Sequence, residues 1–126
     1  MSDTTVLSII ESPTHPDFSA LYRRLGLHEV RATSTRKAMS LIKGVTPDYV
    51  VAEFFYGYGN NYAGVNVSNL DVFLYSLQKY APQARIIVLV DKEERTFVDK
   101  LNALFPLHAV LQQPVNETEL EAVFDG

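Results

Sequence analysis

At its centre the chain carries a short apolar run that closes on an acid, Pro47-Asp48-Tyr49-Val50-Val51-Ala52-Glu53. The run is too short for a helix and is rich in β-branched and aromatic residues, so it predicts a buried strand over residues 49–54. In an open α/β sheet, ligands bind just outside the carboxyl ends of the strands. Glu53 is therefore a candidate functional residue.

Similar apolar runs lie on both sides of this one and alternate with amphipathic segments. They predict further strands over residues 6–10, 29–32, 86–90 and 107–111. Five helices are predicted from apolar residues at helical spacing: Phe18, Leu21, Tyr22 and Leu25; Ala38, Leu41 and Ile42; Leu70, Phe73, Leu74 and Leu77; Phe97, Val98, Leu101 and Leu104; and Leu120, Val123 and Phe124. Strict alternation of strand and helix implies one α/β domain over residues 1–126, with a parallel sheet covered by helices on both faces.

Glycines and capping residues mark the expected helix ends. Gly26 and Gly44 should end the first two helices. The starts are expected at Thr33 or Ser34, at Ser68 or Asn69, at Asp91 with Glu94 three residues on, and at Asn116 with Glu119 three residues on. The last two pairs have the spacing of a capping box.

Composition limits the classes of function. The 126 residues have no cysteine, which excludes disulfides and thiolate metal sites. The formal net charge of −4 disfavours nucleic-acid binding, and the basic stretch from Arg31 to Lys43 is interpreted as a solvated face. No basic leader precedes an apolar stretch, and no apolar run approaches the roughly 18 residues of a membrane span. We therefore expect a cytoplasmic protein that binds neither membranes nor nucleic acids.

Taken together, the strand ends resemble the receiver domains of bacterial response regulators. The similar segments are Val6-Leu7-Ser8-Ile9-Ile10-Glu11, residues 47–53, Arg85-Ile86-Ile87-Val88-Leu89-Val90 and Leu111-Gln112-Gln113-Pro114. They occur in the order of strands one, three, four and five of that family. The resemblance implies a flavodoxin-like (βα)₅ fold with strand order 2-1-3-4-5, and a bacterial signalling protein with protein partners.

The departures from the family fall on its phosphorylation chemistry. Glu53 takes the place of the acceptor Asp, and Ile10 with Glu11 takes the place of an acidic pair. Val90 replaces a hydroxyl residue and Gln113 replaces a Lys. Mg²⁺ prefers oxygen ligands, so Ile10 offers it nothing and we expect no metal cofactor. The amide of Gln113 could donate a hydrogen bond to Glu53 without burying an ion pair.

Three interpretations of this altered pocket follow. We favour a degenerate receiver that acts as a protein-interaction module without phosphorylation and is not an enzyme. A second is a response regulator still phosphorylated, or locked on, through Glu53. A third is a flavodoxin-like domain that binds a small ligand. Flavin is disfavoured, because residues 11–16 contain no glycine and two prolines. The three histidines, His15, His28 and His108, show no metal-ligand spacing.

Two further surfaces are candidates for partner contacts. The segment 55–67 is longer than the receiver pattern, and its aromatic and amide residues are typical of adaptable recognition loops: Phe55, Tyr56, Tyr58, Asn60, Asn61 and Tyr62. The alternative is that this loop folds over the altered pocket. The resemblance also implies a homodimer, with a candidate face at Lys92, Glu94, Arg95, Asp99 and Lys100.

Overall fold

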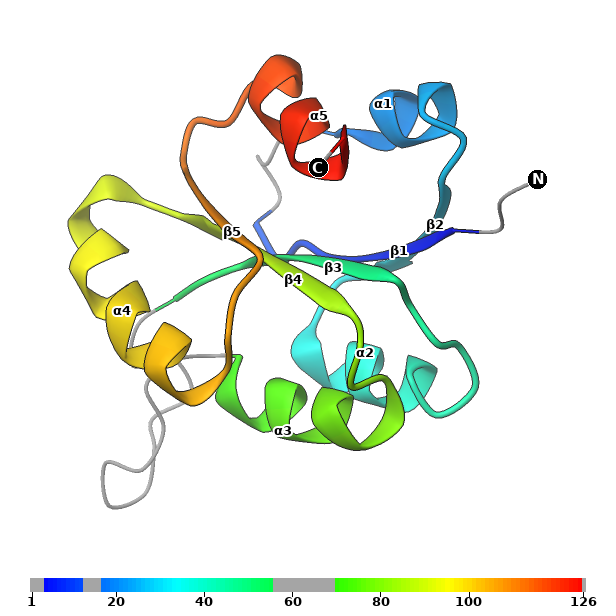
Figure 1. Ribbon diagram of the computed structural model, residues 1–126, viewed down its shortest axis with the longest axis horizontal. Helices are drawn as coiled ribbons and strands as arrows, with labels where there is room; N and C mark the ends of the chain where they lie inside the picture. Colours follow the sequence, from blue (N-terminus) through cyan, green and yellow to red (C-terminus); the bar gives the residue numbers. More distant parts are fainter. Residues whose placement is uncertain (1–3, 13–16, 56–69, 126) are drawn as a thin grey trace.

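Parallel strands form the centre of the protein in the computed structural model, which describes residues 4–12, 17–55 and 70–125 (Figure 1). Within these residues the strands are β1 (Thr5–Ile9), β2 (His28–Ala32), β3 (Tyr49–Glu53), β4 (Arg85–Val90) and β5 (Ala109–Gln112). They make one five-stranded sheet in the order β2-β1-β3-β4-β5, and every neighbouring pair is parallel. The predicted flavodoxin-like strand order is confirmed.

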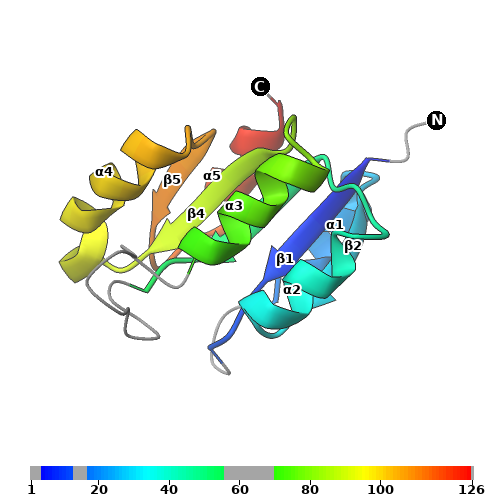
Figure 2. The same ribbon diagram turned by 90° about the horizontal axis from the view of Figure 1, so that it is seen from below.

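Helices cover both faces of this sheet. On one face lie α1 (Ser19–Arg24) and α5 (Glu117–Asp125). The other face is covered by α2 (Thr35–Leu41), α3 (Asp71–Tyr80) and α4 (Arg95–Leu104), with a short 3₁₀ helix, η2 (Lys92–Glu94), leading into α4 (Figures 1 and 2). None of the helices in the described ranges is long and apolar enough to cross a membrane.

Two apolar clusters make the core, one on each side of the sheet. Side chains alternate along each strand, so Leu7 and Ile9 of β1 enter the cluster beneath α2, α3 and α4. Val6 and Ile10 enter the cluster beneath α1 and α5. Strand β4 is buried continuously from Ile86 to Val90, as expected for a central parallel strand covered on both faces.

The first residue of α4 and the set of its buried residues differ from the sequence prediction. A 3₁₀ turn occupies residues 92–94, so the α-helix begins at Arg95, and the side chain of Asp91 makes no capping hydrogen bond. Leu104 was expected in the core but is 48% exposed. It is the last residue of the helix, and Phe105 behind it is buried instead and packs edge-to-face on Tyr75. The predicted capping box at Asp91 and the burial of Leu104 are therefore wrong.

Strand β5 begins at Ala109, two residues later than predicted. The backbone N–H of Leu107 donates to Oδ1 of Asn102 at 2.9 Å, so this amide is bonded to a side chain in the last turn of α4 rather than to the sheet.

Other predicted helix ends are confirmed. Gly26 follows α1 with a φ of 78°, a left-handed conformation that favours glycine. Ser34 caps α2 by accepting a hydrogen bond from the N–H of Lys37 at 3.1 Å. At α5 the capping box is complete, because Asn116 Oδ1 accepts from the N–H of Glu119 at 2.8 Å and Glu119 Oε1 accepts from the N–H of Asn116 at 3.1 Å. The predicted cap at Ser68 or Asn69 lies outside the described residues.

Asn116, which caps α5, and Asp91, which caps no helix, allow a matched test of the assigned caps. We expect Asn116→Ala to lower the free energy of unfolding by about 1 kcal/mol, because it removes the cap of α5. Asp91→Ala removes no cap and should change it by less than about 0.5 kcal/mol. Urea unfolding followed by circular dichroism measures both. Equal losses for the two variants would contradict the assigned caps.

Candidate functional site

The carboxyl ends of β1 and β3 meet at one edge of the sheet. Ile9 of β1 pairs with Ala52 of β3, so the segment that follows β1 passes beside Glu53, the last residue of β3. The structure thus brings Glu11 and Glu53 together, and the contact runs from the Glu11 backbone to the Glu53 side chain.

The Glu53 carboxylate is bound by the backbone after β1. Its Oε1 accepts hydrogen bonds from the N–H of Glu11 at 2.7 Å and from the N–H of Ser12 at 2.9 Å. The side chain is buried, with 2% of its surface exposed. Hydrogen bonds to a carboxylate are charge-assisted and stronger than neutral ones, which makes this buried acid tolerable. Glu53 therefore holds residues 11 and 12 against the end of β3.

Gln113 does not take the role expected of it. Its backbone N–H donates to the carbonyl of Val90 at 2.8 Å, which extends the pairing of β4 and β5. Across the described ranges its half-buried side chain makes no hydrogen bond to Glu53. The hydrogen bond suggested from the sequence is wrong: the donors that the described residues supply to Oε1 of Glu53 are the backbone amides of residues 11 and 12.

Ile10 and Val90, the two apolar residues at positions that are polar in the receiver pattern, belong to the core. Ile10 is 9% exposed and packs in the cluster beneath α1 and α5. Val90 is fully buried in the cluster on the opposite side of the sheet. The altered positions do not converge on one polar pocket, since Ile10 and Val90 stabilise different faces.

Asp71 is a buried acid near this edge that the sequence prediction missed. It is the first residue of α3 and is 1% exposed. A carboxylate is favourable in the first turn of a helix because of the helix dipole. The available signal was its position three residues before Leu74, which places it beside the buried stripe of α3.

Metal-binding side chains are not gathered here. In the part of the chain that the structure describes, no three His, Cys, Asp or Glu residues are grouped so that they could hold a metal ion. His28 is exposed, and His108 lies beside the Tyr49 ring with its Nε2 3.3 Å from the carbonyl of Val123. His15 lies outside the described residues.

Polar contacts shift the pKa of one group near α1, and burial shifts the pKa of another. The backbone N–H of Ser19 donates to Asp17 Oδ1 at 2.9 Å and lowers the pKa of that carboxyl, with Arg31, 3.3 Å away, adding to the effect. Burial raises the pKa of the Tyr22 hydroxyl. Within the basic stretch from Arg31 to Lys43, Arg31 is thus paired with the carboxylate of Asp17.

The two candidate partner surfaces are only partly placed. Of the loop residues, Phe55 is half-buried, and Tyr56, Tyr58, Asn60, Asn61 and Tyr62 lie outside the described residues. The candidate dimer face lies along η2 and α4, where Lys92, Arg95, Asp99 and Lys100 are exposed and Glu94 is half-buried. Pairing through this face stays a prediction, which sedimentation would test.

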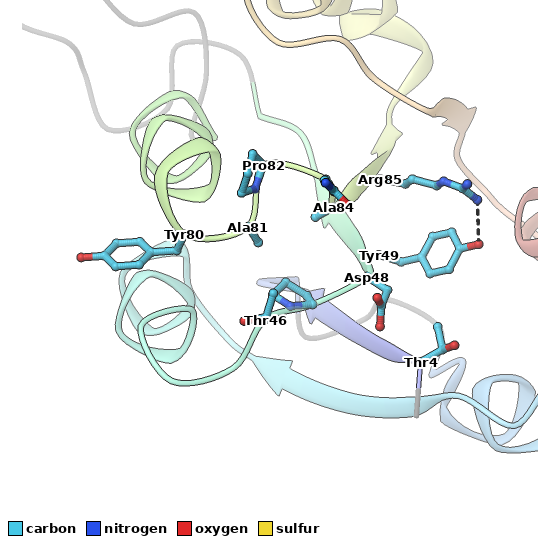
Figure 3. A pocket seen from close by; sticks show the side chains of 11 residues that line it. Thr4, Thr46, Asp48, Tyr49, Tyr80, Ala81, Pro82, Ala84 and Arg85 are labelled. Atoms are coloured by element: carbon cyan, nitrogen blue, oxygen red, sulfur yellow. Dashed lines mark hydrogen bonds between the residues drawn. The ribbon is translucent and has the colours of Figure 1, made fainter. Parts of the chain in front are cut away.

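A hollow lies at the opposite, amino-terminal edge of the sheet (Figure 3). It has a volume of about 490 Å³, and Asp48, Tyr49, Tyr80 and Arg85 are among its lining residues. Arg85 donates a hydrogen bond to the Tyr49 hydroxyl at 3.2 Å, and Asp48 accepts one from the N–H of Thr5 at 2.8 Å. Sequence reasoning missed this hollow, because it considered only the carboxyl edge.

The fold and strand order define a flavodoxin-like α/β protein. No protein-family model matches the chain, and no curated protein matches it. Solved structures of similar fold include the chemotaxis protein CheY4 of Vibrio cholerae, with a TM-score of 0.74 and 14% identity over 98% of each chain. A response regulator receiver domain protein from Clostridium thermocellum has a TM-score of 0.72 and 17% identity, over 97% of this chain and 91% of that one.

Similarity of this kind extends to proteins with other names. A structure described as an adenylate cyclase from Rhodopirellula baltica has a TM-score of 0.70 and 13% identity, over 98% of this chain and 86% of that one. At such identities the likeness shows the fold alone. The function has to be argued from the residues of this chain.

Proposed function

We propose that this chain is a receiver-like signalling module that binds protein partners without being phosphorylated. The observation that carries the proposal is the state of Glu53, whose Oε1 accepts two backbone hydrogen bonds while the side chain is 2% exposed. The receiver-like fold supports a role in signalling. The proposal includes that the protein is not an enzyme and that it acts in the bacterial cytoplasm.

Burial and bonding of Glu53 both oppose phosphoryl transfer. Such transfer depends on positioning and on neutralising the charge of the phosphoryl group. A donor would have to reach a carboxylate that is almost fully covered and bonded to the amides of residues 11 and 12. Val90 offers no hydroxyl, and Gln113 offers no cation.

The residues at this edge also fit a magnesium ion poorly. Mg²⁺ takes oxygen ligands in a near-octahedral arrangement. Ile10 contributes no oxygen and packs in the core, and Oε1 of Glu53 is already an acceptor for two amides. A metal-dependent switch at this place is therefore not part of the proposal.

Beryllofluoride with Mg²⁺ mimics a phosphoryl group and tests the proposal directly. We expect no saturable change in the amide NMR signals of Glu11, Ser12 and Glu53 when it is added to the wild-type protein. Glu53→Asp should respond no better, because Ile10, Val90 and Gln113 remain. Mg²⁺ alone and fluoride alone are the controls. Saturable changes centred on Glu53 would instead support a regulator that is still phosphorylated.

A further inference from the structure

Helices α2 and α3 lie side by side on the face of the sheet that they share with α4 (Figure 2). Their side chains line a groove between them. Its volume is about 350 Å³. Its polar lining comes from α2 and the turn after it, and from the second half of α3: Arg36, Ser40, Lys43, Ser76, Lys79 and Tyr80. We call this surface the basic groove.

The basic groove concentrates positive charge in a protein whose formal net charge is −4. Arg36, Lys43 and Lys79 are all exposed, and none of the lining residues in the described ranges is an acid. Among the residues that the structure describes, the ion pairs involve only Arg24 and Arg31 on the basic side. The three cations of the groove therefore have no carboxylate partner within the described part of the chain.

Helix electrostatics account for only part of this cluster. Lys79 lies in the last turn of α3 and Lys43 lies just after α2, where cations complement the negative end of a helix dipole. Arg36 lies in the first turn of α2, which has no acidic residue. A cation at that end of a helix is unfavourable, so its presence points to a use outside the helix.

Tyr80 adds an aromatic anchor at the end of the basic groove. Its side chain is 38% exposed, and Nζ of Lys79 lies 5.5 Å from the centroid of its ring. Tyr80 also borders the hollow at the amino-terminal edge, where its ring points away from Tyr49 and Arg85 (Figure 3). Tyrosine and arginine are enriched among the residues that dominate binding at protein interfaces.

The spacing of the cations favours an extended ligand over a single anion. Arg36 and Lys43 are seven positions apart, which corresponds to roughly 10 Å along a helix axis. An extended chain advances about 3.3 Å per residue, so about three residues of an acidic segment would span them. A nucleic acid is disfavoured, because its affinity comes from many phosphate contacts and the rest of this chain is acidic.

We propose that the basic groove is a docking site for an acidic, extended segment of a partner protein. Carboxylates of the segment contact Arg36, Lys43 and Lys79, and an apolar residue packs on Tyr80. The inference rests on the proposed role as a protein-interaction module. It concerns a different surface from Glu53, so its test can fail without deciding the beryllofluoride experiment.

The test uses the full chain and a dye-labelled peptide in which glutamates alternate with leucine and tyrosine. Fluorescence anisotropy measures affinity, and amide NMR shifts locate the site. We expect shifts at Arg36, Ser40, Lys79 and Tyr80, and none at Glu53. The same peptide with glutamine in place of glutamate should bind at least about tenfold more weakly. Added salt should weaken binding of the acidic peptide, because the ion pairs between its glutamates and the groove would be exposed to solvent.

Two sets of variants supply matched controls. Reversing the charges together (Arg36→Glu, Lys43→Glu and Lys79→Glu) should weaken binding roughly tenfold, since three attractive contacts become repulsive. Reversing Arg23, Arg24 and Arg31 to Glu, which are exposed cations outside both the groove and the candidate dimer face, changes the net charge equally but should change affinity less than about twofold. Tyr80→Ala should weaken binding severalfold. Tyr75→Ala, which changes an exposed tyrosine outside the groove on the same helix, should not.

Several results would overturn the proposal. They are no saturable binding of the acidic peptide, equal losses from the two charge-reversed triple variants, and shifts located away from α2 and α3. A single-stranded oligonucleotide that binds the groove as tightly as the peptide would also overturn it, because the groove would then select polyanions rather than protein segments.

Discussion

Glu53→Ala is expected to lower the free energy of unfolding by about 2–4 kcal/mol, because it removes a buried acceptor of two charge-assisted hydrogen bonds. The amides of Glu11 and Ser12 lose the oxygen that lies 2.7 and 2.9 Å away. The substitution also leaves a cavity at a position that is 2% exposed. Chemical unfolding in urea measures the loss.

Two conservative variants separate the hydrogen bonds from the side-chain volume. Glu53→Gln keeps an oxygen acceptor and nearly the same volume, so it should lose less than half as much stability. Ser12→Ala keeps the backbone N–H that donates to Glu53 and should cost less than about 0.5 kcal/mol. If Glu53→Ala were no more destabilising than Ser12→Ala, the buried acid would have no role in holding the segment after β1.

Leu101→Ala is expected to lower the free energy of unfolding by about 2–5 kcal/mol, the range for a buried leucine that leaves a cavity. Leu101 is fully buried in the cluster beneath α2, α3 and α4. Leu104 belongs to the same predicted stripe of the same helix but is 48% exposed. Leu104→Ala should therefore cost less than about 1 kcal/mol.

The comparison of these two leucines tests which face of α4 packs against the core. Both variants remove the same atoms from one helix, so differences in intrinsic helix propensity cancel. Thermal or urea unfolding of the pair gives the difference directly. Equal costs would mean that residue 104 is in the core, as the apolar spacing alone predicted, and that α4 is rotated relative to the structure described.

Local patterns predicted most of the fold. The stripe of α3 was identified fully, because Leu70, Phe73, Leu74 and Leu77 are all buried. The capping box at Asn116 was identified because both partners lie within one helical turn. The same pattern failed at Asp91, where a 3₁₀ turn intervenes. Such a turn depends on how the chain leaves β4, which no four-residue pattern records.

The candidate site was predicted in outline only. The carboxyl-edge rule singled out Glu53, and the structure places the Glu11 backbone beside it. It did not identify the donors to Glu53, and it suggested Gln113 wrongly. It also left the stretch from Arg31 to Lys43 as a solvated face, because Lys79 and Tyr80 join it from a helix that is distant in the sequence.

The sequence by itself determined the type and chain order of the β-strands and α-helices that the structure describes, though not the 3₁₀ turn before α4. These follow from continuous apolar runs and from helical spacing, both of which are local properties of the chain. Only the tertiary structure decided what binds Glu53 and what the cations of α2 face. Every residue except proline carries a backbone N–H, so no side-chain pattern marks the two amides that approach this carboxylate. A groove between two helices exists only once they pack.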